Sequence, residues 1–207
     1  MGQLIALNLL WFFTSLPLIS VGASTAALYH CCLKLRKEKD IPVIRTYLKA
    51  LRENAKQATL AWLMIVSITL LLVWEQRFLR STPGLLALVL GYLQWLVGLL
   101  LVILAAYIFP VIAAFRNRLR LLIGHAFFFF FKKIHYGLAT ILLIVFPLWV
   151  TVADRRFFAA YLFIWLLFGI SGIAYLQSCL LWRLFRPYLG GEESKPCADH
   201  DTDQYVF

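Results

Sequence analysis

The chain has 207 residues, of which 62% are hydrophobic and 14% are charged. A soluble domain carries roughly a quarter charged residues and buries only part of its surface, so this composition excludes a soluble globular fold. The net charge of +10 comes from short basic clusters beside apolar runs, which indicates cytoplasmic loops of a membrane protein and not a nucleic-acid surface. The predicted partner is therefore the lipid bilayer.

Five apolar stretches are long enough, or nearly so, to cross a bilayer, for which a helix needs about 20 residues. They are residues 4–29, 59–78, 84–115, 137–152 and 157–181. No Lys or Arg precedes the first stretch, so it is predicted to be a retained span and not a signal peptide. The third is longer than a bilayer requires and is expected to tilt or to project beyond it. The predicted fold class is an all-α bundle of five transmembrane helices.

Lys and Arg are distributed unevenly among the connections. Of the 20 such residues, 16 lie in residues 34–56, residues 116–133 and the C-terminal part of the chain, and the alternate connections hold the rest. Because cytoplasmic loops are enriched in Lys and Arg, the sequence predicts an outside N-terminus and a cytoplasmic C-terminus. Residues 1–189 are predicted to form one transmembrane domain, and the polar residues 190–207 a disordered cytoplasmic tail.

Two basic segments are predicted to form amphipathic cytoplasmic helices. In residues 41–57, apolar side chains recur at helical spacing on one face and basic side chains occupy the other. This pattern is typical of a helix lying on the inner membrane surface. The residues predicted to contact the membrane surface or a partner are Arg45, Lys49, Arg52 and Lys56, with Arg116, Arg118 and Arg120 from the second segment.

The second segment, residues 116–133, contains five consecutive phenylalanines at positions 127–131. This run is too short to span and is bracketed by basic residues. Three interpretations of residues 121–131 stay open: an interfacial helix, a re-entrant helix, or an extension of the fourth span.

Small residues occupy positions 22–27 of the first span. Small side chains let helices approach closely in membranes. Gly22, Ala23 and Ala26, together with Pro17 before them, are therefore candidate helix-packing residues. Contact with a partner helix and contact within the chain are both consistent with this run.

Residues that could carry chemistry are few. The sequence has no acidic residue at membrane depth, no Gly-x-Ser-x-Gly or His-Glu-x-x-His motif and no glycine-rich phosphate loop, so neither an enzyme nor a cofactor is predicted. Polar side chains inside the spans are expected to make helix–helix hydrogen bonds. They include Asn8, Ser15, Gln94, Ser171 and Gln177.

One set of potential metal ligands combines His30, Cys31 and Cys32 with Cys197 and His200. A zinc site is one interpretation. The favoured one is that the adjacent cysteines are small apolar helix residues and that the tail pair is incidental. No metal site is therefore predicted.

Several runs of residues resemble the YesL family. These are NLLW at 8–11, SLP at 15–17, GASTAALY at 22–29, LKALRENAKQATLAW at 48–62, YIFP at 107–110 and AYLQS at 174–178. The resemblance extends to about residue 188 and is most specific in the first third of the chain. The YesL family comprises small bacterial membrane proteins whose domain has no assigned function and whose genes often lie beside those of carbohydrate ABC importers.

The resemblance implies a multi-pass protein of the bacterial cell membrane, with ABC permease subunits as partners, and brings no catalytic residues. The leading hypothesis is an accessory or regulatory subunit of a carbohydrate ABC importer with no chemistry of its own. One alternative is a transporter or channel built on proline-broken helices. Another is a membrane-bound sensor or regulator that acts through its basic cytoplasmic helix. The sugar, the direction of regulation and the oligomeric state do not follow from the sequence.

Overall fold

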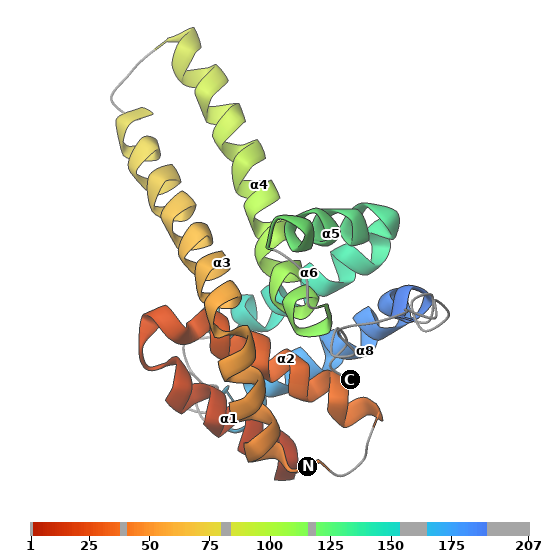
Figure 1. Ribbon diagram of the computed structural model, residues 1–207. Helices are drawn as coiled ribbons and strands as arrows, with labels where there is room; N and C mark the ends of the chain where they lie inside the picture. Colours follow the sequence, from red (N-terminus) through yellow and green to blue (C-terminus); the bar gives the residue numbers. More distant parts are fainter. Residues whose placement is uncertain (1, 38–40, 80–83, 116–118, 154–164, 190–207) are drawn as a thin grey trace.

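The computed structural model describes residues 2–37, 41–79, 84–115, 119–153 and 165–189. Within these ranges the protein is helical and has no strand (Figure 1). The elements are α1 (Gly2–Ser15), the 3-10 turn η1 (Leu18–Ser20), α2 (Val21–Lys37), α3 (Val43–Leu79), α4 (Leu85–Ala114), α5 (Leu119–Lys132), α6 (Ile134–Ala153), the π-helical turn η3 (Trp165–Gly169) and α8 (Ile170–Leu189).

Four helical stretches in the described ranges are long and apolar enough to cross a membrane. They are Leu18–Arg36, Val43–Arg77, Leu88–Ala114 and Ile134–Thr151. The protein is thus a multi-pass helical membrane protein by the length and composition of its helices. The fifth predicted span lies partly outside the described residues, and its described part, Ile170–Trp182, is a shorter apolar helix.

The first predicted span is not one continuous helix. Pro17 has an extended backbone (ψ 112°) and lacks an N–H, so α1 ends and the chain turns through η1 into α2. The two helices lie against each other, because the Trp11 indole N–H donates to Thr25 Oγ1 of α2 at 3.2 Å. The turn between them is fixed by the Ser20 hydroxyl of η1, which donates to the Thr14 carbonyl of α1. The expected single helix is therefore a helical hairpin, of which Leu18–Arg36 is by itself long and apolar enough to cross a membrane.

The hairpin also brings the start of α1 close to the start of α3. Gly2 and Gln3, at the start of α1, share a hollow with Pro42 and Arg45 at the start of α3. The N-terminal end of α1 thus lies on the same side of the molecule as the basic segment 41–57.

Residues 41–57 do not form a separate surface helix either. They continue without a break into the second predicted span, because residues 43–79 contain no glycine or proline to interrupt the helix. With a rise of 1.5 Å per residue, α3 is about 55 Å long. Its buried face packs on α2 through Val43, Tyr47 and the small residues Ala50, Ala58 and Ala61.

Helix α4 agrees with the third predicted span, 84–115, to within a residue at each end. Its second half, from Ile103 to Phe115, is largely buried among α2, α3 and α5. Its first half runs beside the second half of α3, and the two project together from the rest of the molecule (Figure 1). We call α3 from residue 60 and α4 up to residue 102 the α3–α4 arm.

The phenylalanine run belongs to its own helix, α5, which ends before α6 begins at Ile134. Phe129 and Phe130 are buried against α4, where Phe130 meets the Tyr107 ring edge-on and Phe129 stacks on Phe115. Phe128 and Phe131 are exposed. The run therefore does not extend the fourth span, and α6 instead begins three residues before the predicted start at 137.

Candidate functional site

The α3–α4 arm exposes apolar side chains on most of its circumference. Leu63, Leu70 and Trp74 are exposed on α3, and Leu88, Leu96 and Leu99 on α4. The two helices are joined by one hydrogen bond along this length, from the Gln94 amide to the Leu72 carbonyl at 2.9 Å, among the described residues. The arm is thus a long apolar surface that lipid or another protein must cover.

Two aromatic residues lie near the middle of the arm on α4. Tyr92 and Trp95 are each 76% exposed. At 1.5 Å per residue they lie about 10 and 15 Å from the start of α4. In a hydrocarbon core of about 30 Å that began there, Tyr92 would lie a third of the way in and Trp95 at the centre. Interfacial depths are where lipid-facing tyrosine and tryptophan are usually found.

Two glycines share this part of α4. A Cβ added at Gly91 or Gly98 would meet no atom within 4 Å. The two residues are seven apart, so they lie on one face, and Trp95 lies beside them on α4. Small residues that no neighbour of the chain uses leave room for a foreign helix to approach closely.

The small residues predicted for helix packing, unlike Gly91 and Gly98, are buried against other parts of the same chain. Gly22 is buried against α3, where an added Cβ would lie 2.6 Å from the Trp62 Cβ. Ala23 and Ala26 are also buried within the chain. Pro17 is exposed at the turn of the α1–α2 hairpin. This run is thus covered by the protein itself.

The predicted basic contact residues of α3 are all exposed: Arg45, Lys49, Arg52 and Lys56. Lys49 pairs with Glu53 at 3.9 Å. Arg120 is exposed on α5, whereas Arg116 and Arg118 lie outside the described residues.

Asn8 joins α1 to the irregular start of the last helix. Its amide nitrogen donates to the Trp165 carbonyl at 2.9 Å, and its side-chain oxygen accepts the Ser171 N–H at 3.1 Å. The π-helical turn η3 shifts the regular hydrogen-bond ladder, which leaves such groups in need of partners. Buried Asn8 therefore satisfies a donor and an acceptor at the η3–α8 junction.

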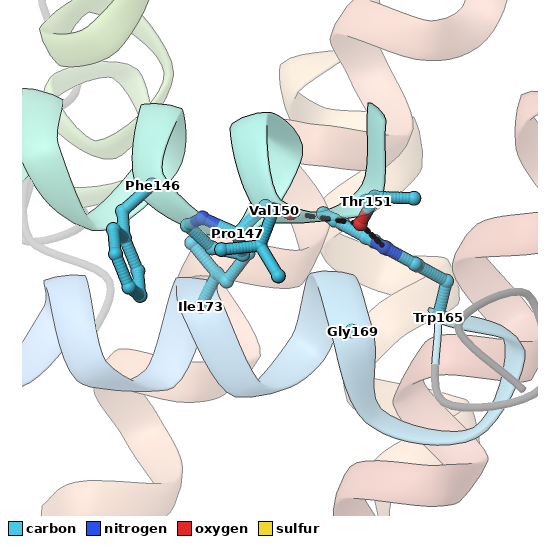
Figure 2. Close-up of a pocket in the computed structure, with 7 residues that line it drawn as sticks. All are labelled: Phe146, Pro147, Val150, Thr151, Trp165, Gly169 and Ile173. Atoms are coloured by element: carbon cyan, nitrogen blue, oxygen red, sulfur yellow. Dashed lines mark hydrogen bonds between the residues drawn. The ribbon is translucent and has the colours of Figure 1, made fainter. Parts of the chain in front are cut away.

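A cavity of about 280 Å³ lies between this turn and α6 (Figure 2). It is lined mainly by apolar groups, including Phe146, Pro147 and Ile173. On one side the Trp165 indole N–H donates to Thr151 Oγ1 at 2.9 Å, and the Thr151 hydroxyl donates to the Pro147 carbonyl at 2.7 Å. This lining fits an apolar group and offers no chemistry for a reaction.

A chain of buried polar groups crosses the centre of the bundle. The Tyr29 hydroxyl of α2 donates to Gln177 Oε1 of α8, and the Gln177 amide donates to the Thr140 carbonyl of α6 at 3.4 Å. Tyr107 of α4 is fully buried, and its hydroxyl makes no hydrogen bond of ordinary geometry with the described residues. The network ties three helices together in a place where a polar group without a partner is costly.

The expected helix–helix role of the polar residues is confirmed for Asn8, Gln94 and Gln177. It is wrong for Ser15, whose hydroxyl donates to the Phe12 carbonyl of its own helix at 3.0 Å. The Ser171 side chain likewise bonds within its own segment, to the Phe168 carbonyl, and its backbone N–H makes the link to Asn8. Serine hydroxyls commonly donate to a carbonyl of the preceding turn, so they are not available for a hydrogen bond to another helix.

A double-mutant cycle measures the central link of this network. We expect Tyr29→Phe and Gln177→Leu to be coupled by about 1 kcal/mol in the free energy of unfolding, as for hydrogen bonds between membrane helices. The measurement is reversible denaturant unfolding in mixed micelles. Tyr29→Phe combined with Gln94→Leu, in the distant arm, should be additive. A coupling energy near zero for the first pair would contradict the assigned bond.

No group of three or more His, Cys, Asp and Glu side chains that could hold a metal occurs within the described ranges. Cys31 and Cys32 are buried in the apolar core. Cys197 and His200, the other residues of the alternative zinc set, lie outside those ranges.

These features define a multi-pass helical membrane protein with an exposed apolar arm and a basic helix face. Residues 4–76 match a protein family described as protein of unknown function, DUF624. This match spans α1, α2 and most of α3, including the basic face. No curated protein and no solved structure matches the chain.

Proposed function

We propose that this protein is an accessory or regulatory subunit of a carbohydrate ABC importer in the bacterial cell membrane, and that it docks on the permease through the α3–α4 arm. The importer is inferred as the partner from the resemblance to the YesL family. Assignment of the chain to that family is part of the proposal. In this proposal residues 41–57, the N-terminus and the C-terminus are cytoplasmic, and the protein carries out no reaction of its own.

The observation that carries the proposal is the exposure of Tyr92 and Trp95 at mid-depth of the arm. A hydroxyl or indole N–H in hydrocarbon without an acceptor is unfavourable by several kcal/mol. Trp95 makes no hydrogen bond with the described part of the chain. A permease helix with a free carbonyl or hydroxyl would provide that acceptor, and tryptophan and tyrosine are the residues that most often dominate such contacts.

The experiment is a pulldown of the tagged protein from its native membrane in mild detergent, followed by mass spectrometry. Enrichment of ABC permease and ATPase subunits supports the proposal. A clean preparation without them would contradict it.

Variants locate the contact on the arm. We expect Gly91→Leu with Gly98→Leu to reduce the recovered permease at least fivefold, because leucine fills the space that a partner helix needs. The fold should tolerate these changes because a Cβ added at either position would meet no atom within 4 Å. Leu138→Ala with Leu142→Ala, exposed on α6, is the matched control and should leave recovery unchanged. Equal recovery from all variants would place the contact elsewhere.

A transporter in its own right is a second candidate, favoured by the Pro17 break between α1 and α2 and by the Asn8-bridged π-helical turn. Interrupted helices of this kind form substrate sites in many transporters. Sugar uptake by liposomes that contain the purified protein, above the level of protein-free liposomes, would favour this candidate. The absence of uptake would count against a transporter and favour the accessory role.

A further inference from the structure

The exposed face of α3 carries basic side chains over its first part and apolar side chains beyond it. Arg45, Lys49, Arg52 and Lys56 follow one another at spacings of four, three and four residues, so they form one stripe. The same face continues with exposed apolar residues. These are Leu60, Leu63, Leu70 and Trp74. The step from cationic to apolar between positions 56 and 60 marks where α3 enters the hydrocarbon on the cytoplasmic side.

This step gives the depth of each basic side chain. With α3 crossing the bilayer and rising 1.5 Å per residue, Arg45 lies about 16 Å below Lys56, or about 13 Å with a tilt of 40°. A headgroup layer is about 5–7 Å thick, and charges are screened over about 8 Å at physiological salt. Lys56 and Arg52 therefore reach the lipid headgroups, whereas Arg45 and Lys49 lie beyond them in the cytoplasm.

The far end of the stripe has other features of a contact surface. Ile44 is 60% exposed and Leu48 is 41% exposed, beside Arg45 and Lys49. A hollow of about 420 Å³ lies next to Arg45, between residues 42–45 and the start of α1 at Gly2 and Gln3. Exposed apolar side chains in the cytoplasm, bordered by cations and a hollow, are typical of a protein contact.

We propose that the cytoplasmic end of the basic stripe of α3, Arg45 and Lys49, with Ile44, Leu48 and the adjoining hollow, is a docking surface for an acidic segment of a cytoplasmic protein. An acidic helix laid along this end of the stripe places carboxylates opposite Arg45 and Lys49, while apolar residues at its edge cover Ile44 and Leu48. The proposal rests on the proposed function for its partner's identity, a cytoplasmic importer component, but not for the chemistry of the surface.

The test uses the full-length protein in nanodiscs of phosphatidylcholine and a fluorescein-labelled 15-residue peptide of glutamate, alanine and leucine as the probe. Binding is followed by fluorescence anisotropy. We expect saturable, salt-sensitive binding, and we expect Arg45→Gln with Lys49→Gln to raise the Kd about fivefold, since exposed charge pairs contribute up to about 1 kcal/mol each. The control is Arg77→Gln with Arg120→Gln, exposed basic residues away from the stripe, which should leave the Kd within twofold.

Three results would overturn the proposal. One is a peptide that does not bind, and another is equal weakening by the two double variants, which would mean that only net charge matters. The third is displacement of the peptide from the wild-type protein when phosphatidylglycerol is added to the nanodiscs, because lipid headgroups then hold the stripe. No importer subunit is present, so failure here is distinguishable from failure of the permease pulldown.

Discussion

Replacing Gly22 by alanine is expected to destabilise the protein by about 1–3 kcal/mol, the usual effect of overpacking. The added Cβ would lie 2.6 Å from the Trp62 Cβ and would also meet the backbone of Ala58. Both neighbours belong to the long helix α3, and the Trp62 indole N–H of that helix also donates to the Leu18 carbonyl at 2.9 Å. The added methyl group can therefore be accommodated only if the whole α1–α2 hairpin moves away from α3. The measurement is reversible denaturant unfolding in mixed micelles.

The matched control is Gly91→Ala on α4, where an added Cβ meets no atom within 4 Å. Alanine has the higher helix propensity, so this variant should be neutral or slightly more stable, by up to about 1 kcal/mol. The two substitutions are chemically the same and differ in their surroundings. If Gly22→Ala were as stable as Gly91→Ala, the close packing of α2 on α3 would be wrong.

Replacing Asn8 by leucine should destabilise the protein by about 2–4 kcal/mol. Leucine keeps most of the volume but leaves the Trp165 carbonyl and the Ser171 N–H without the partners that Asn8 provides. Each buried polar group that loses its hydrogen bond is unfavourable by about 1–3 kcal/mol. Hydrogen exchange followed by mass spectrometry should show loss of protection in the first turns of α8 before the rest of the bundle.

Two further variants test this interpretation of Asn8. Asn8→Asp keeps an acceptor for the Ser171 N–H but faces the Trp165 carbonyl with an oxygen, so it should also be destabilising. Asn54→Ala is the control, because the Asn54 amide donates to the Ala50 carbonyl of its own helix at 3.1 Å and bonds to no second element among the described residues. Equal effects of the substitutions at positions 8 and 54 would refute a bridging role for Asn8.

Composition and hydropathy were enough to predict an all-helical membrane protein and the bounds of α4. They could not separate α1 from α2, because a proline inside an apolar run is compatible with a kinked span as well as with a hairpin. The decisive contacts, Trp11 with Thr25 and Trp62 with Leu18, depend on tertiary packing.

The basic face of α3 was recognisable from spacing, because four cations at helical intervals need no tertiary information. Its continuity with the span was harder to foresee, although the absence of glycine and proline between residues 43 and 79 was a signal. The exposure of Trp95 could not be predicted, because nothing in the sequence distinguishes which side of an entirely apolar helix faces a neighbour. The same ambiguity concealed the open positions at Gly91 and Gly98.

Site-specific photo-crosslinking in native membranes tests the central claim, that the arm contacts a permease, most directly. p-Benzoylphenylalanine would replace Trp95 on the arm and, as a matched exposed position, Leu138 on α6. The account predicts an adduct with an ABC permease subunit from position 95 and none from position 138. Adducts from both positions alike, or lipid adducts alone at position 95, would contradict it.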